Sequence, residues 1–168
     1  MNDRVFDELV RRHEGALTTF ARSLTRDQWS AEEAVQETLV RAWKYLDTFD
    51  GRGSFEGWLL RICRNVVIDQ AKAAARRPAT FEVHELDRLI QPLENDATHE
   101  LIELLHQLSV DHREVLVIVG VLGFSYEEVA RTLDLPTGTV RSRLGRARQA
   151  FSELLVVTGL GSHQAGAA

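Results

Sequence analysis

Apolar residues in this sequence recur at α-helical spacing along most of its length, and this period constrains the fold more than any other feature. In the first segment, residues 5–24, they fall on one helical face: Phe6, Leu9, Val10, Leu17, Phe20 and Ala21. No segment shows the sustained alternation of apolar and polar residues that a half-buried strand needs. The pattern therefore predicts an all-α fold.

Helix starts and breaks divide the chain into two parts. Two Ser-x-x-Glu sequences, residues 30–33 and 125–128, are typical of capping boxes, in which both side chains satisfy free amides at a helix start. Residues 50–54 and 76–78 contain the Gly and Pro residues that interrupt helices. We expect one helix to begin at the first box, with others at residues 54–75, 100–108, 111–122, 125–133 and 139–155. Two small helical domains, residues 1–77 and 99–157, would be joined by a flexible linker, 78–98, and followed by a flexible tail, 158–168.

The last expected helix has an apolar face and a basic face. Its apolar residues share one side: Val140, Leu144, Ala147 and Phe151. The opposite, exposed side would carry Arg141, Ser142, Gly145 and Arg146, flanked by Arg143 and Arg148 and preceded by Thr139. A short helix and a turn precede it, which is the order of a helix-turn-helix motif, whose second helix enters the major groove of DNA.

The distribution of charge favours DNA binding by this helix over the alternative of a merely solvated surface. The whole chain has a net charge of −5, which argues against nonspecific binding of nucleic acid by the entire surface. Four arginines and a single acid follow Pro136, whereas residues 100–135 contain seven acids and two arginines. Phosphates would attract the first segment and not the second.

The helix expected at residues 54–75 also carries two ordered faces. Its apolar stripe is expected in the core and comprises Leu59, Ile62, Cys63 and Val66. A second stripe combines an aromatic ring, two cations and an amide: Trp58, Arg61, Asn65 and Lys72. Such side chains suit base stacking, phosphate contact and hydrogen bonding to single-stranded DNA.

Three blocks of sequence resemble the extracytoplasmic-function (ECF) sigma factors of bacterial RNA polymerase. They are residues 30–43 (SAEEAVQETLVRAW), residues 49–65 (FDGRGSFEGWLLRICRN), and residues 124–130 with 136–148 (FSYEEVA and PTGTVRSRLGRAR). Each block alone is moderately specific, and their occurrence in this order is strongly specific. The resemblance covers residues 5–76 and 98–155.

The resemblance implies roles for particular residues. Contacts with the β′ clamp helices of the core polymerase would be made by Glu33, Gln36, Glu37 and Arg41. Reading and melting of the −10 element would fall to Phe49, Arg52, Ser54, Trp58, Arg61, Asn65 and Lys72. The −35 element would be read by Thr139, Arg141, Ser142, Arg143, Gly145, Arg146 and Arg148. The family also implies binding to the β flap, control by an anti-sigma factor, and no catalytic activity.

Other interpretations of the sequence explain less of it. An ordinary helix-turn-helix regulator accounts for residues 100–155 but leaves the polar faces of the N-terminal half unexplained, and a two-domain adaptor does not predict the segregated arginines. His99, Glu103 and His106 share a helix face, yet no second ligand cluster accompanies them, so we expect no metal. No nucleophile–base pair or cofactor motif is evident. A single cysteine, Cys63, a polar N-terminus and the lack of a long apolar window indicate a cytoplasmic protein without direct membrane insertion.

Overall fold

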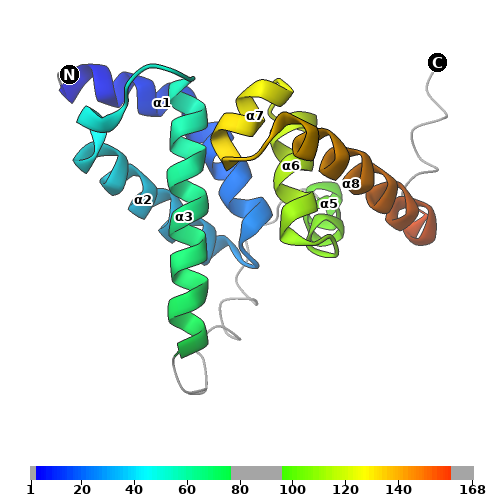
Figure 1. Cartoon of the computed structure of the whole chain (residues 1–168). Helices are drawn as coiled ribbons and strands as arrows, with labels where there is room; N and C mark the ends of the chain where they lie inside the picture. The colour runs from blue at the N-terminus through cyan, green and yellow to red at the C-terminus, as the bar shows by residue number, and fades with distance from the viewer. Residues whose placement is uncertain (1–2, 77–95, 160–168) are drawn as a thin grey trace, which may run out of the picture.

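The regular structure of the described residues is entirely helical, as the sequence predicts. The computed structural model describes residues 3–76 and 96–159. Its elements in chain order (Figure 1) are α1 (Asp3–Leu24), α2 (Gln28–Lys44), the 3-10 turn η1 (Leu46–Thr48), α3 (Phe55–Arg76), α5 (Asp96–His106), α6 (Val110–Gly120), α7 (Tyr126–Leu133) and α8 (Thr137–Thr158). The expected linker as far as residue 95, and the tail from residue 160, lie outside the described residues.

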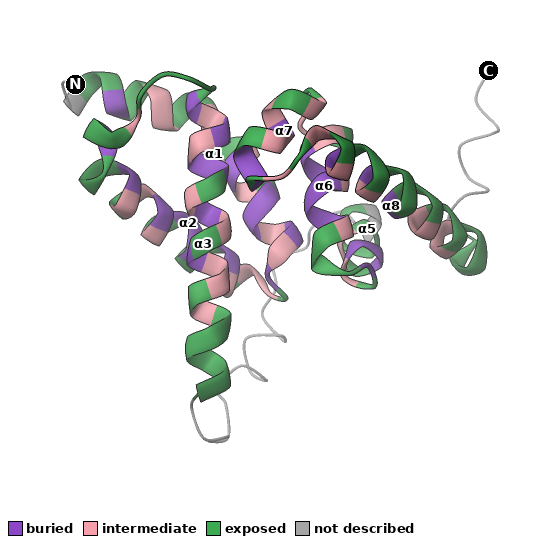
Figure 2. Ribbon diagram, in the orientation of Figure 1, coloured by how far each residue is buried: buried purple, intermediate pink, exposed green. Residues whose placement is uncertain are grey.

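Helices α1, α2 and α3 pack against one another as an N-terminal group. A small core joins the start of α1, the end of α2 and the start of α3, and consists of Phe6, Ala42, Leu46, Phe55 and Leu59. The expected apolar face of α3 is confirmed, because Leu59, Cys63 and Val66 are buried. Burial of this face leaves the other side of α3 to solvent along much of its length (Figure 2).

The predicted capping box at residues 30–33 is wrong, because α2 begins two residues before Ser30. Its N-cap is Asp27, whose carboxylate accepts a hydrogen bond of 2.8 Å from the Ser30 amide. The Ser30 hydroxyl donates to the same carboxylate at 2.9 Å. A carboxylate caps a helix at least as well as a hydroxyl, so the earlier start satisfies the free amides and also brings Trp29 into the helix.

Helices α5 to α8 form the C-terminal group, and here the predicted capping box is confirmed. The Ser125 hydroxyl accepts from the Glu128 amide, and the Glu128 carboxylate accepts from the Ser125 amide at 2.8 Å. Helix α7 ends at Asp134, which adopts a left-handed conformation with φ of 55°. This cap turns the chain into α8, in which Val140, Leu144 and Ala147 are buried as expected, whereas Phe151, the fourth residue of the expected face, is half-buried.

The two groups of helices share one continuous core. Buried side chains of α1 and α3 (Leu17, Phe20, Leu60, Cys63) belong to the same cluster as those of α6 (Val115, Ile118) and α8 (Val140, Leu144). Helix α1 contacts α5 and α6, and α3 contacts α7, so the two groups are joined by two sets of helix–helix contacts (Figures 1 and 2). The sequence predicts two domains but gives no sign that they bury each other's surface.

A buried arginine holds the junction of these helices. Arg113 of α6 donates to the carbonyls of Leu105, His106 and Leu108 at the α5–α6 turn, at distances of 2.8 to 3.2 Å. It also donates to the carbonyl of Ser23, near the end of α1, at 3.1 Å. Because every one of these acceptors is a backbone carbonyl, the guanidinium satisfies helix ends that would otherwise be buried without partners.

Candidate functional site

The outer face of α8 presents the residues expected to read DNA. Arg141, Ser142, Gly145, Arg146 and Arg148 are exposed, on the side of α8 opposite its buried residues. A side chain added at Gly145 would meet nothing within 4 Å, so this position lies open on the surface. The face is therefore basic, has little bulk at its middle, and is supported by a packed core, as a recognition helix requires.

Three predicted residues of α8 make contacts within the protein. Arg143 is half-buried, and its Nη2 atom lies 3.0 Å from a carboxylate oxygen of Asp111 on α6. The Ser142 hydroxyl donates to the carbonyl of Thr139 at 3.1 Å. Arg141 lies over the ring of Tyr126, with its guanidinium carbon 5.9 Å from the ring centroid. Arg146 and Arg148 are exposed on this face and take no part in these intramolecular contacts.

The start of α3 and the preceding loop carry an aromatic cluster. The Phe49 and Trp58 ring centroids are 5.4 Å apart, and each ring also contacts Phe55, at 5.6 and 5.5 Å. Ser54 accepts a hydrogen bond of 3.1 Å from the Gly57 amide, so it fixes the first turn of α3. The predicted loop residues Phe49, Ser54 and Trp58 are therefore brought together, with the two rings only partly buried.

The remaining predicted residues of α3 spread along its exposed side. Arg61, Asn65 and Lys72 are all exposed. The C-terminal end of α3 extends beyond the other helices (Figure 2). Arg52 is exposed in the loop and pairs with Asp50 at 3.3 Å. The stripe predicted from the sequence is thus a continuous solvent-facing surface from the loop to the end of the helix.

A hollow of about 320 Å³ lies between this surface and α7. From the N-terminal group it is lined by Phe49, Asp50, Arg52, Gly53, Ser54, Gly57, Trp58 and Arg61. Its opposite wall comes from α7 and the turn after it: Glu128, Arg131, Thr132 and Asp134. The hollow combines two aromatic faces, which suit stacking of a base, with three guanidinium groups and three carboxylates. Sequence reasoning did not predict that α7 would form part of this wall.

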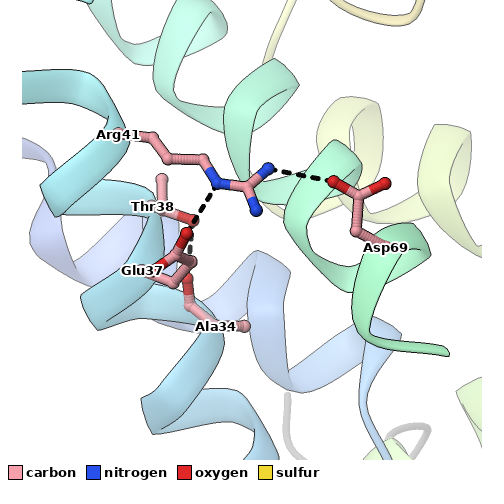
Figure 3. A network of polar contacts seen from close by, with 5 residues as sticks. All are labelled: Ala34, Glu37, Thr38, Arg41 and Asp69. Atoms are coloured by element: carbon pink, nitrogen blue, oxygen red, sulfur yellow. Dashed lines mark hydrogen bonds and ion pairs between the residues drawn. The ribbon is translucent and has the colours of Figure 1, made fainter. Parts of the chain in front are cut away.

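The four residues predicted to contact the β′ clamp helices divide into two pairs. Glu33 and Gln36 are exposed on the outer face of α2. Arg41 instead donates to Glu37 at 2.7 Å and to Asp69 of α3 at 3.0 Å (Figure 3). Both hydrogen bonds raise the pKa of Arg41, and the one to Asp69 ties α2 to α3. Glu37 and Arg41 therefore have a structural role that Glu33 and Gln36 lack.

The outer face of α2 also carries large apolar side chains that the sequence analysis did not select. Trp29 and Val40 are each 63% exposed, and Trp43 is 47% exposed. Together with Glu33 and Gln36 they fall within an arc of about 80° on a helix of 100° per residue. The helical spacing of these residues was visible in the sequence, but the predicted helix start at Ser30 left Trp29 outside the helix. A mixed apolar and acidic face of this size marks a protein-binding surface.

The described residues contain neither a metal-binding cluster nor a reactive thiol. No three of their His, Cys, Asp or Glu side chains gather so as to hold a metal ion, and His99 and Glu103 are exposed while His106 turns inward. Cys63 is fully buried, and burial raises the pKa of its thiol to about 12, so the reactive thiolate does not form near neutral pH. Within the described part of the chain, no helix has the length and apolar character needed to cross a membrane.

Comparison with known proteins finds the same two regions in the same order. Residues 9–77 match the family described as Sigma-70 region 2, and residues 98–151 match Sigma-70, region 4. The fold and its two exposed faces thus define a transcription initiation factor of the sigma-70 class.

Several curated relatives place the chain within this class. CnrH of Cupriavidus metallidurans, an RNA polymerase sigma factor, is 35% identical over 92% of this chain and 88% of its own length. The ECF sigma factor SigC of Mycobacterium tuberculosis is 34% identical over 81% of each chain. The ECF sigma factor SigE of Mycolicibacterium smegmatis is 32% identical over 89% of this chain, which spans 61% of that relative. The chain belongs to the ECF family of RNA polymerase sigma factors.

Solved structures share the arrangement over nearly the whole chain. The sigma factor RpoE of Bartonella quintana, in complex with the anti-sigma factor NepR, has a TM-score of 0.74 and 30% identity, covering 92% of this chain and 98% of that one. CnrH in complex with the cytosolic domain of CnrY has a TM-score of 0.72 and 34% identity, covering 93% and 90%. Because the coverage spans both helical groups, the similarity extends to the way they pack together.

Proposed function

We propose that this protein binds core RNA polymerase and directs it to promoters by reading the −10 and −35 elements. The observation that carries the proposal is that regions 2 and 4 occur in one chain in this order, and that each presents an exposed polar face on a packed helical core. Residues 1–77 would contact the polymerase and the −10 element, and residues 99–157 would read the −35 element. The protein would act in the cytoplasm and would have no catalytic activity of its own.

The polymerase contact falls on the outer face of α2. Glu33 and Gln36 would contact the β′ clamp helices, and Trp29 and Val40 would supply the apolar area that makes such an interface stable. Glu37 and Arg41 would act mainly by fixing α2 against α3, since their hydrogen bonds are already made within the protein. The β flap would bind the C-terminal group.

The DNA contacts divide between α3 and α8. The loop residues Phe49, Arg52 and Ser54 and the start of α3 would receive a flipped base of the −10 strand, whose extraction costs a few kcal/mol. Arg61, Asn65 and Lys72 would follow the same strand along the exposed side of α3. Positions 139–148 of α8 would read the −35 element, with Arg146 best placed for a bidentate contact to guanine.

An anti-sigma factor is the expected regulator. Of the two similar solved structures, the first holds the anti-sigma factor NepR and the second holds the cytosolic domain of CnrY. The exposed apolar residues of α2 provide a surface that such a partner would cover together with the polymerase-binding face. We therefore propose that the regulator and the core polymerase compete for this protein.

Co-elution with purified core RNA polymerase tests the proposal. The folded protein is expected to elute with the polymerase from a sizing column and to be displaced by an excess of the housekeeping sigma factor. Failure of the folded, inhibitor-free protein to bind would contradict the sigma-factor function. The C-terminal group would then be an ordinary helix-turn-helix regulator.

A further inference from the structure

The exposed side of α3 carries one acidic residue among its basic ones. Between Trp58 and the end of α3 the sequence contains four basic residues and a single acid, Asp69. On a helix of about 100° per residue, Asp69 shares an arc of about 80° with the residues proposed to follow the −10 strand, which are Trp58, Arg61, Asn65 and Lys72. The Asp69 side chain is 56% exposed. An unpaired carboxylate there would repel the phosphates that the neighbouring cations attract.

An arginine of α2 pairs with this carboxylate. The Nη1 atom of Arg41 donates to Oδ2 of Asp69 at 3.0 Å, a contact between residues 28 positions apart in the chain (Figure 3). The same guanidinium donates from Nε to Oε1 of Glu37, one turn earlier on α2, at 2.7 Å. Because each of two edges of the guanidinium has a carboxylate partner, the group is held in one orientation beside Asp69.

The pair affects the charge of the α3 surface more than it affects stability. Arg41 is 33% exposed and Asp69 is 56% exposed, so the pair lies in contact with solvent. An ion pair in such a place contributes little to the free energy of unfolding. Its effect on an approaching anion is larger, since a phosphate near the pair meets a neutral group, whereas a phosphate near Asp69 alone meets a like charge.

We infer that Arg41 serves the −10 surface through Asp69, by neutralising the charge of that carboxylate so that a DNA strand can lie along α3. The inference rests on the proposed function of the α3 surface. It gives Arg41 a role in DNA binding in addition to its bond between α2 and α3. It also explains how α3 keeps an acid within a surface for an anionic ligand: Asp69 holds α2, and a cation from α2 cancels its charge.

Arg41→Ala and Asp69→Asn, singly and together, separate this role from a purely structural one. Arg41→Ala leaves the Asp69 charge unpaired and should weaken the binding of single-stranded DNA about 3-fold to 10-fold at about 50 mM salt. Asp69→Asn removes the charge and should bind at least as tightly as wild type. The double variant should also bind like wild type, although it lacks the ion pair.

The probe is a random-sequence pool of labelled single strands of about 12 nucleotides, and its binding to the full chain is followed by fluorescence anisotropy. A random pool is sufficient, because every sequence carries the same phosphates. Urea unfolding of the same samples measures the structural contribution of the pair. Arg41→Ala and the double variant both lack the bond between α2 and α3, so they should lose similar stability, while only Arg41→Ala should bind DNA weakly.

Two further variants control for charge changes elsewhere. Arg11→Ala removes one positive charge from an exposed position of α1 and should affect DNA binding far less than Arg41→Ala does. Arg41→Ala also leaves Glu37 unpaired, so Glu37→Gln is added to it in a separate variant. This addition should restore little binding, because Glu37 lies on α2 and outside the α3 stripe. Restoration equal to that given by Asp69→Asn would show that Asp69 is not the cause.

The salt dependence of the loss reports its electrostatic origin. The difference in affinity between wild type and Arg41→Ala should narrow between about 50 and 200 mM salt, because the Debye length falls over this range. A loss that persists in the double variant would overturn the inference, since Arg41 would then contact DNA itself or act only through the fold. A loss that is the same at both salt concentrations would overturn it as well.

Lys72→Ala and Arg61→Ala test the proposed function of the surface separately. Each removes a cation of the stripe without removing the Arg41–Asp69 pair, and each should weaken binding. If wild type does not bind the pool, or if neither substitution weakens binding, α3 does not hold the strand and the inference fails with the proposed surface. If both weaken binding while Arg41→Ala binds like wild type, the proposed surface stands and the inference alone is wrong.

Discussion

At the scale of single residues, side chains that look alike in the sequence differ in the structure, because some are exposed and others contact residues of the same protein. Arg143 and Arg146 are three positions apart on one helix, yet Arg143 pairs with Asp111 while Arg146 is exposed. Helical periodicity places both near the basic face, and a contact with another helix removes one of them from it. Substitution of Arg146 therefore tests DNA recognition more directly than substitution of Arg143 does.

Arg146→Ala should weaken binding to the −35 element and leave polymerase binding intact. Loss of a bidentate contact to guanine costs about 1–3 kcal/mol, or roughly 5-fold to 150-fold in affinity. The measurement is binding of the polymerase complex to promoter fragments with intact and altered −35 elements. Arg11→Ala, an exposed arginine of α1, is the control and should change neither quantity. Equal loss of polymerase binding in Arg146→Ala would refute its assigned role.

His106 should make the protein less stable in mild acid. Burial, followed by the charge of Arg113, lowers the pKa of His106 below its ordinary value of 6.5. Its Nε2 atom is buried and has no hydrogen-bond partner among the described residues. Between the ordinary pKa and the lowered one the unfolded chain binds the proton more readily. The free energy of unfolding therefore falls as the pH drops through this window and is fully retained above it.

Urea unfolding at a series of pH values from 7.5 to 5 checks this prediction. His106→Gln removes the titrating ring, so its stability should decline less than that of wild type as the pH falls. Contributions from other titrating groups are common to both proteins and cancel in the difference. Parallel profiles for the two proteins would show that His106 does not contribute.

At the scale of elements, the start of α2 shows how a capping motif can mislead. The Ser-x-x-Glu match at residues 30–33 predicted the cap at Ser30. The helix uses Asp27, because this start adds a turn and places Ser30 where its amide and hydroxyl both bond to the same carboxylate. The motif at Ser125 has no such competitor directly before it, and there the prediction is confirmed.

Alanine substitutions at Asp27 and Ser30 should differ in their effect on stability. Asp27→Ala removes the cap and should lower the free energy of unfolding by about 1 kcal/mol, within a range of roughly 0.5–2 kcal/mol. Ser30→Ala retains the capping bond from its backbone amide and should cost less. Urea denaturation measures both. A larger loss in Ser30→Ala than in Asp27→Ala would contradict the assigned start of α2.

A substitution on the outer face of α2 tests polymerase binding without disturbing the fold. Glu33→Lys reverses a charge on this face, should weaken binding to core polymerase and should not change stability. Glu37→Lys is less informative, since it also breaks the bond to Arg41, the residue whose other bond, to Asp69, ties α2 to α3. Glu14→Lys, the same change at an exposed position of α1, is the control. Co-elution yields and competition with wild type measure the effect, and unaltered binding by Glu33→Lys would count against this face.

At the scale of the whole molecule, the net charge of −5 opposes DNA binding by the free protein. Core polymerase would hold the two regions apart at a fixed separation, so that two weak contacts act as one bivalent contact. The physical requirement for tight binding is therefore the spacing of α3 and α8, in addition to the side chains on each.

Promoter affinity should accordingly depend on the polymerase. At about 150 mM salt the free protein should bind a promoter fragment at least roughly 100-fold more weakly than its complex with core polymerase does, as expected when a second contact becomes intramolecular. Fluorescence anisotropy with and without core polymerase measures both affinities. Tight, sequence-specific binding by the isolated protein would contradict the expectation that each contact is weak on its own.

The sequence by itself determined the helical class, the two regions, the Ser125 cap and the buried and basic faces of α8, because all of these follow from local spacing and cap chemistry. It also indicated the polar stripe of α3 and part of the exposed face of α2. Only the tertiary structure decided that Arg143 pairs with Asp111, that Arg113 joins α6 to α1, and that α7 rests on Gly57. These contacts join residues far apart in the chain, and no local period can encode which helices will share a core.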